Sequence, residues 1–129
     1  FMKETILLFH VEDKTLKSGI EQALFPFHIR VKKVPRSDYC KPLGILAGII
    51  KEEQTTEPYF GQELDAPMMI FVGISDGKLD SILQSLRSRK VRLPYKAVLT
   101  PTNALWTPLK CFEELRREHE AMSANRQKS

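Results

Sequence analysis

The sequence predicts an α+β domain with a four-stranded sheet of ferredoxin-like, split β-α-β topology and an extra C-terminal helix. Short apolar stretches alternate along the chain with segments whose apolar residues recur at helical spacing, which predicts the class. The first and third strand candidates are the most apolar, and the second carries lysines. A buried strand suits the centre of a sheet and a lysine-bearing strand suits an edge, which favours this topology. A small parallel three-layer α/β fold is the alternative.

The length and composition describe one domain with a substantial core. The chain has 129 residues, of which 42% are hydrophobic and 28% charged. We expect a single domain over residues 1–122, a mobile acidic loop at 52–66 and a polar tail at 123–129. The sequence contains no apolar stretch long enough to cross a bilayer and no signal-peptide core, so we expect a cytoplasmic protein.

The first part of the chain is expected to form a strand, a helix and a second strand. Residues 5–11 are an apolar run that two acidic residues end. Asp13 is a good N-cap for the following helix, which should end near Pro26. Residues 29–33 alternate between apolar and basic side chains, as a half-buried edge strand does.

Residues 42–50 predict a short helix with Pro42 in its first turn. Gly44 and Gly48 each weaken such a helix by about 1 kcal/mol relative to alanine. They also leave a flat patch that a neighbouring backbone can approach.

The second part of the chain repeats the alternation of strand and helix. Residues 68–74 are the second strongly apolar strand, and Ser75 is an N-cap for the next helix. A short fourth strand is expected at 95–100. Thr107 as N-cap with Pro108 at the first helical position opens the last helix.

Both faces of the predicted sheet are apolar, because alternate residues of 5–11 and of 68–74 are hydrophobic on either side. Two helices can cover one face. The other must be covered by the 43–50 segment and the last helix, or by a second subunit, since large bare apolar patches are rare. We expect a mixture of the two, with a homodimer through the second face of the sheet.

The sequence shows no specific catalytic constellation. It lacks a glycine-rich phosphate loop, a GxSxG elbow and an HExxH motif. Its two cysteines are far apart and its three histidines form no close ligand pair. We therefore assign no catalytic residue, no cofactor and no metal ligand, and the sequence favours a non-enzymatic role.

The most unusual stretch is residues 99–107, which sets hydroxyl and amide side chains and the single tryptophan between a strand and a helix. Our candidate ligand-binding residues are Thr100, Thr102, Asn103, Trp106 and, at the end of the first strand, His10. The competing interpretation is that this loop shapes turns, caps the last helix and plugs the core. An enzyme that uses His10 with Thr102 or Asn103 is a further alternative.

Basic residues gather in the run 87–96, within a net charge of +4. This run is the basis of an alternative function as a nucleic-acid-binding module. An RNA-binding sheet needs exposed aromatic residues on its central strands, and the required glycine and aromatic pattern is absent from the sequence. We expect nucleic acid not to be the partner.

Three segments resemble a known family. They are KPLGILAG at 41–48, PMMIFVGIS at 67–75 and KAVLTPTNALWT at 96–107. Together they resemble DUF3783, a bacterial domain of unknown function, from the first strand to the last helix. The last segment is the most specific.

The resemblance implies a bacterial cytoplasmic protein and marks 42–48 and 100–107 as family signatures that serve either fold or function. It also implies that the acidic insert at 52–65 varies, and it supplies no activity, catalytic residue or cofactor. We therefore expect a non-catalytic regulatory or interaction domain that binds a small polar ligand or a protein partner.

Overall fold

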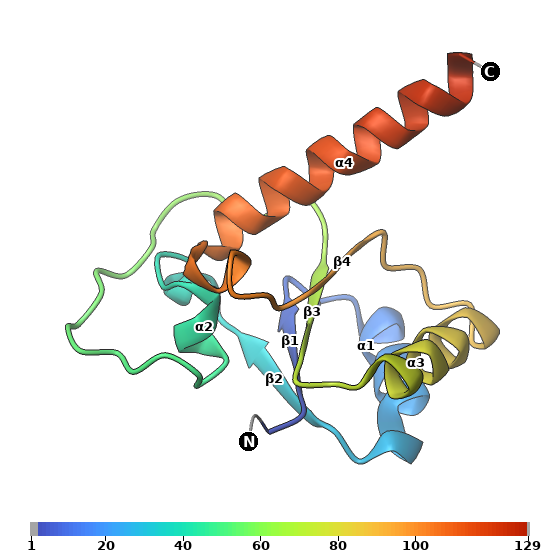
Figure 1. Cartoon of the computed structure of the whole chain (residues 1–129), viewed down its shortest axis with the longest axis horizontal. Coiled ribbons are helices and arrows are strands. Elements are labelled where there is room, and N and C mark those ends of the chain that lie inside the picture. Colours follow the sequence, from blue (N-terminus) through green and yellow to red (C-terminus); the bar gives the residue numbers. More distant parts are fainter. Residues whose placement is uncertain (1–2, 129) are drawn as a thin grey trace.

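The structure, a computed structural model, describes residues 3–128 and follows the predicted order of strands and helices (Figure 1). Residues 1–2 and 129 of the expected domain and tail lie outside the described residues. The strands are β1 (Thr5–Phe9), β2 (Arg30–Val34), β3 (Met68–Val72) and β4 (Tyr95–Val98). The helices are α1 (Lys14–Leu24), α2 (Leu43–Leu46), α3 (Asp76–Ser88) and α4 (Pro108–Lys128).

Local capping begins the helices where the sequence predicts. The carboxylate of Asp13 accepts a hydrogen bond from the amide of Leu16 at 2.8 Å, and the Ser75 hydroxyl accepts one from the amide of Lys78 at 3.4 Å. The Thr107 hydroxyl accepts one from the amide of Lys110 at 3.2 Å at the start of α4.

Two β-α-β units build the sheet. The first unit is residues 5–34 (β1, α1, β2) and the second unit is residues 68–98 (β3, α3, β4), and the two strands within each unit are parallel. The units meet through β1 and β3, which are antiparallel, so the strand order is β2-β1-β3-β4. The α+β class is confirmed, and the first and third strands are central as predicted.

The ferredoxin-like order is not the one observed. A split β-α-β unit leaves another strand between the two strands that its helix joins, whereas here α1 returns the chain directly beside β1. The apolar pattern distinguishes central from edge strands, but it carries no information on which edge each outer strand takes. Helices cover both faces, as in the three-layer alternative, although the sheet is mixed rather than parallel.

The helices α1 and α3 cover one face of the sheet. Alternate residues of β1 and β3 meet them in a buried cluster: Ile6, Leu8, Met69 and Phe71 from the strands, and Ile20, Ala23, Leu24, Ile82 and Leu86 from the helices. Burial of each large aliphatic or aromatic side chain contributes about 1.5–3 kcal/mol.

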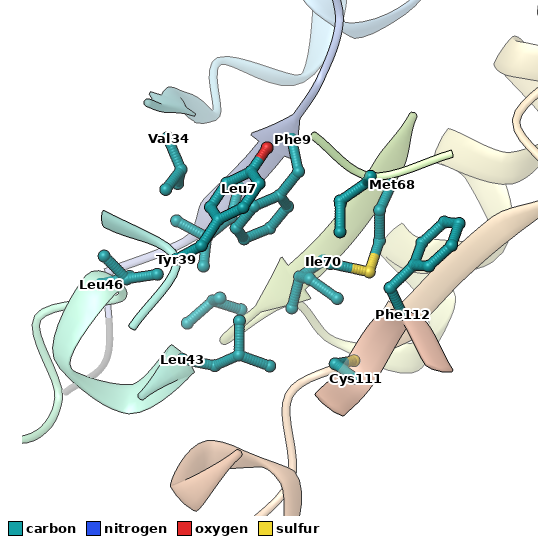
Figure 2. Close-up of a cluster of buried hydrophobic side chains, with 12 residues drawn as sticks. Leu7, Phe9, Val34, Tyr39, Leu43, Leu46, Met68, Ile70, Cys111 and Phe112 are labelled. Carbon is teal, nitrogen blue, oxygen red and sulfur yellow. The ribbon is translucent and has the colours of Figure 1, made fainter. Parts of the chain in front are cut away.

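The second face of the sheet is covered within the chain. Figure 2 shows Tyr39 lying against β1 and Phe112 of α4 beside Met68. Leu7 and Ile70, whose side chains point to this face, are fully buried. The cover predicted from the chain itself is thus present, since α2, α4 and the segments beside them pack on this face, and the homodimer stays a prediction from the sequence.

The segments 42–48 and 100–107 pack against each other. The amide of Leu43 donates a hydrogen bond to the carbonyl of Trp106 at 2.8 Å. A Cβ atom on Gly44 would lie 3.1 Å from the Ala104 carbonyl oxygen and 2.4 Å from Cδ1 of Ile50. The close approach expected at this glycine is thus present, and the contact shows a role of both segments in the fold.

Helix α4 divides into a buried and a projecting half (Figure 1). Cys111 and Phe112 are buried against the sheet, whereas residues 117–125 are exposed. The helix continues through Lys128, so the residues expected to form a polar tail from 123 onward are helical as far as the structure describes them. Ion pairs run along the helix, such as Arg116 with Glu113 at 2.8 Å and with Glu120 at 3.9 Å.

Candidate functional site

A cleft lies at the carboxyl ends of β1 and β2. Its volume is about 460 Å³, within the range of small-molecule sites, and we name it the β1–β2 cleft. Its lining residues are Leu8, His10, Val11, Glu12, Lys33, Val34, Pro35, Arg36 and Glu63. Parallel strands place the residues that follow them at a common edge, which brings segments distant in sequence together here.

His10 follows β1 directly and adopts a left-handed backbone conformation, with φ of 59°. This conformation costs a non-glycine residue about 1–2 kcal/mol, although histidine adopts it more readily than most. Its side chain is 27% exposed, and its Nδ1 atom is buried with no hydrogen-bond partner among the described residues. Strain of this kind in a cleft is typical of residues held for a function.

Glu63 faces His10 from the long loop between α2 and β3. One carboxylate oxygen, Oε1, accepts hydrogen bonds from the Tyr39 hydroxyl at 2.5 Å and from the Leu64 amide at 2.9 Å. The other, Oε2, lies 3.7 Å from Nδ1 of His10. Two donors therefore fix the orientation of the carboxylate and leave its second oxygen directed at the imidazole.

Tyr39 supports this arrangement from the core. It is fully buried, and burial followed by the hydrogen bond to Glu63 raises its pKa well above the ordinary value. The hydroxyl consequently stays protonated and acts as a donor to the carboxylate. The ring of Tyr39 also packs against that of Tyr59, with centroids 5.8 Å apart, which anchors the loop that carries Glu63.

The sequence analysis missed Glu63 and Tyr39. Glu63 lies in an acidic segment that the composition describes as a mobile loop, and no periodic pattern distinguishes it from its neighbours. The loop is in fact tied down near this position, because the Tyr59 amide donates to the Ser37 carbonyl at 3.0 Å and Leu64 is buried. An apolar residue, Leu64, between two acidic ones was the one signal available in the sequence.

The loop at 99–107 uses its predicted ligand-binding groups to hold its own conformation. The amide side chain of Asn103 accepts from the Thr100 backbone N–H at 2.8 Å and donates to the Val98 carbonyl at 2.9 Å. The Asn103 backbone N–H donates in return to the Thr100 hydroxyl at 3.1 Å. We call this reciprocal set of bonds the Thr100–Asn103 clasp. It matches the interpretation of this loop as a turn-forming segment.

A small pocket of about 250 Å³ lies beside the clasp and brings Thr100, Thr102, Asn103 and Trp106 together. Thr102 is exposed, and Nζ of Lys110 lies 5.5 Å from the centroid of the Trp106 ring. Cys111 lines the same pocket, and burial raises the pKa of its thiol to about 12. It is therefore a neutral packing residue rather than a nucleophile at neutral pH.

His10 does not belong to this pocket. Phe9 pairs with Met68 and Met68 with Tyr95, whereas Thr5 pairs with Val72. His10 therefore follows the sheet at the edge where β4 begins, and Thr100 follows it at the opposite edge. The proposed enzyme that uses His10 with Thr102 or Asn103 is wrong for this reason.

The basic run 87–96 is divided between two parts of the surface, because Arg89, Lys90 and Arg92 line a groove beside α1 whereas Lys96 lines the pocket at 99–107. Arg87 donates to Gln84 at 2.9 Å and Arg89 to Gln22 at 3.2 Å, whereas Lys96 lies on β4 and donates to the Leu93 carbonyl. Burial and then Arg87 lower the pKa of Lys96. The middle of the run borders a shallow groove of about 850 Å³ against α1.

Comparison with known proteins finds a family model that matches part of the chain. The model of DUF3783, a domain of unknown function, matches residues 67–122. The match covers the second unit, the following loop and most of α4, and it supports the resemblance seen in the sequence. The match includes the segments 67–75 and 96–107, whereas 41–48 lies outside it. Among curated proteins and among solved structures, none matches the chain.

None of the helices in residues 3–128 combines the length and the apolar character that a bilayer crossing requires. The cytoplasmic location stays a prediction from the sequence.

Proposed function

We propose that this protein is a non-catalytic binding domain that takes up a small polar ligand in the β1–β2 cleft. The observation that carries the proposal is His10, which occupies a strained backbone position with its buried Nδ1 atom unpaired and directed at Glu63. A buried polar atom without a partner costs about 1–3 kcal/mol, which a ligand group that pairs with it can recover.

The cleft is a better candidate than the pocket at 99–107. It is larger, at about 460 Å³ against about 250 Å³, and it offers groups of both charges, since Lys33 and Arg36 line it with the two glutamates. In the pocket, the polar groups of Thr100 and Asn103 already pair with each other and with Val98. A ligand there would have to break bonds that hold the loop.

Native mass spectrometry of the protein purified gently from cells tests the proposal, together with the variants His10→Ala and Thr102→Ala. Both side chains line a pocket, and both variants remove a polar group from it. We expect an extra mass on the wild-type protein and on Thr102→Ala, and its loss from His10→Ala.

The opposite pattern, with loss in Thr102→Ala and retention in His10→Ala, would place the ligand in the pocket at 99–107. A second measurement addresses a ligand lost in purification. Backbone amide NMR spectra recorded with a small-molecule cell extract should shift at His10, Glu12 and Arg36. A bare wild-type protein with no shift at the cleft would overturn the proposal.

Nucleic-acid binding is the second candidate, because the groove beside α1 gathers several cations. Lys14, Arg89, Lys90 and Arg92 line it, and its one acidic lining residue, Asp13, already accepts the N-cap hydrogen bond of α1. Binding there predicts retention on DNA or RNA that weakens steeply with salt. Retention that salt leaves unchanged, or that survives Arg89→Ala with Arg92→Ala, would contradict it. A protein partner stays a prediction from the sequence.

A further inference from the structure

A set of three potential metal ligands meets in the β1–β2 cleft. One atom each from His10, Glu12 and Glu63 lies within 4.8 Å of the other two. Nδ1 of His10 is 3.7 Å from Oε2 of Glu63 and 3.9 Å from Oε1 of Glu12. We propose that these three side chains bind a divalent first-row transition-metal ion, an inference that rests on the cleft being the ligand site.

The distances favour a shared cation over direct pairing. A protonated imidazole that pairs with a carboxylate closes to about 2.7–2.9 Å, which is about 1 Å shorter than either separation here. A neutral nitrogen with its lone pair toward two carboxylates is unfavourable by itself. Ligand atoms at about 2.0–2.2 Å from one ion lie roughly 3.3–3.6 Å apart, close to the observed spacing. Glu12 is 76% exposed on its side chain and is free to close the remaining gap.

The best-fixed ligand is Glu63. Tyr39 and the Leu64 amide hold Oε1, so Oε2 keeps its lone pairs for another partner. Carboxylates that bind metals in proteins are commonly held by hydrogen bonds of this kind, and these partners change affinity by about 10–100-fold. Tyr39 is thus a positioning residue for the metal site.

The backbone conformation at His10 places the imidazole ligand. The left-handed conformation at His10 turns the chain between β1 and the Asp13 cap, so that the imidazole lies in the cleft beside Glu63. The exposed His28 shares this conformation, with φ of 53°, but lines a different part of the surface. It therefore serves as a control for any effect of the backbone alone.

The donor set indicates the kind of metal. One imidazole nitrogen with two carboxylates suits Zn²⁺, Mn²⁺ or Fe²⁺, whereas Mg²⁺ and Ca²⁺ prefer ligand sets made of oxygen alone. Three protein ligands leave at least one coordination position for another molecule. Lys33 and Arg36 line the same cleft, so an anion is the favoured occupant of that position.

Isothermal titration of Zn²⁺ and of Mn²⁺ into tag-free, chelator-treated protein tests the inference. We expect one ion per chain for the wild-type protein, and an affinity at least tenfold weaker for His10→Gly and for Glu63→Gln. Tyr39→Phe should weaken binding by about tenfold through the orientation of Glu63. The visible spectrum of the Co²⁺-loaded protein should change in the same three variants.

Two control variants should bind as the wild-type protein does. His28→Gly removes an imidazole from a left-handed position outside the cleft, and Glu57→Gln removes an acidic side chain from the same loop as Glu63. Wild-type affinity in His10→Gly or in Glu63→Gln would overturn the metal site, as would a wild-type protein that binds neither ion.

The outcomes separate this inference from the proposed function. An organic mass that is lost in His10→Ala, with no metal binding by titration, would retain the cleft as the ligand site and reject the metal. Metal binding that Glu57→Gln weakens as much as Glu63→Gln would indicate nonspecific attraction to the acidic loop, and would also reject the site.

Discussion

The two β-α-β units follow the same backbone plan. In each, a residue in the left-handed conformation follows the first strand, His10 with φ of 59° and Gly73 with φ of 68°. An N-cap then begins the helix, and a second left-handed residue, His28 or Lys90, lies between the helix and the second strand. Because the units join through antiparallel strands, the ends of their parallel pairs lie at opposite edges of the sheet.

The two units differ in the residues that follow the ends of their parallel strands. The second unit has glycine after its first strand, and its second strand runs into the Thr100–Asn103 clasp, where the polar groups satisfy each other. The first unit has a histidine at the strained position and an open cleft. The comparison indicates that conformation alone does not require the histidine, since glycine serves the same turn without strain.

The largest effect should come from removing the clasp. Asn103→Ala leaves the Thr100 amide and the Val98 carbonyl without their partner, and we expect it to lower the free energy of unfolding by about 2–3 kcal/mol. Urea unfolding measures the change. Thr102→Ala, which alters an exposed neighbour, should change it by less than about 0.5 kcal/mol. Equal stability of the two variants would show that the second unit does not depend on this closure.

A smaller loss is expected where α2 packs on the same loop. Gly44→Ala places a methyl group against Ile50 and the Ala104 carbonyl, and should cost about 1–2 kcal/mol. Gly77→Ala is the matched control, because it lies in α3 with open space around it and should raise stability by up to about 1 kcal/mol. If Gly44→Ala left the free energy of unfolding unchanged, the segments 42–48 and 100–107 would be able to move apart at little cost.

Replacing either strained histidine by glycine should stabilise the protein, unlike the two substitutions above. His10→Gly and His28→Gly each relieve a left-handed conformation, and we expect each to raise the free energy of unfolding by up to about 1 kcal/mol. Thermal and urea unfolding of both variants check this. A loss of stability in His10→Gly alone would show that its imidazole stabilises the fold, and would weaken the reason for assigning it a function.

The smallest effect concerns the thiols. Cys111 is buried and its pKa is raised from 9.0 to about 12, so it should not react with a thiol reagent at pH 8, whereas the partly exposed Cys40 should. Because the pKa is higher in the folded state, the neutral thiol stabilises the fold fully below about pH 9 and loses this contribution between pH 9 and 12. Two fast-reacting thiols in the native protein would show that this end of the sheet opens.

The sequence predicts the elements of this fold better than their arrangement. Caps such as Asp13 and Ser75 and the apolar runs of β1 and β3 are local signals, so the element order and the central strands were predictable. The path by which α1 returns to the sheet depends on packing between distant segments, and no local pattern records it.

The candidate site was predictable only in part. His10 was identifiable from its position at the end of a buried strand. Glu63, which faces it, lies 53 residues further along the chain, and Tyr39, which holds Glu63, lies 29 residues further along. The polar loop at 99–107 was a candidate because hydroxyl and amide side chains are typical of both binding sites and turns. Sequence alone does not distinguish these uses, because the difference lies in whether the groups are already paired.

The two halves of α4 imply that order in this helix is not uniform. Its first half packs against the sheet through Cys111 and Phe112, whereas residues 117–125 are exposed and the nearest ion pairs join Arg116 to Glu113 and Glu120. Salt screens such pairs, and amides without buried contacts open locally. Hydrogen exchange should therefore be slow near Phe112 and fast near Met122. Raising the ionic strength should therefore shorten the ordered part of α4 from its exposed end, while the sheet keeps its structure.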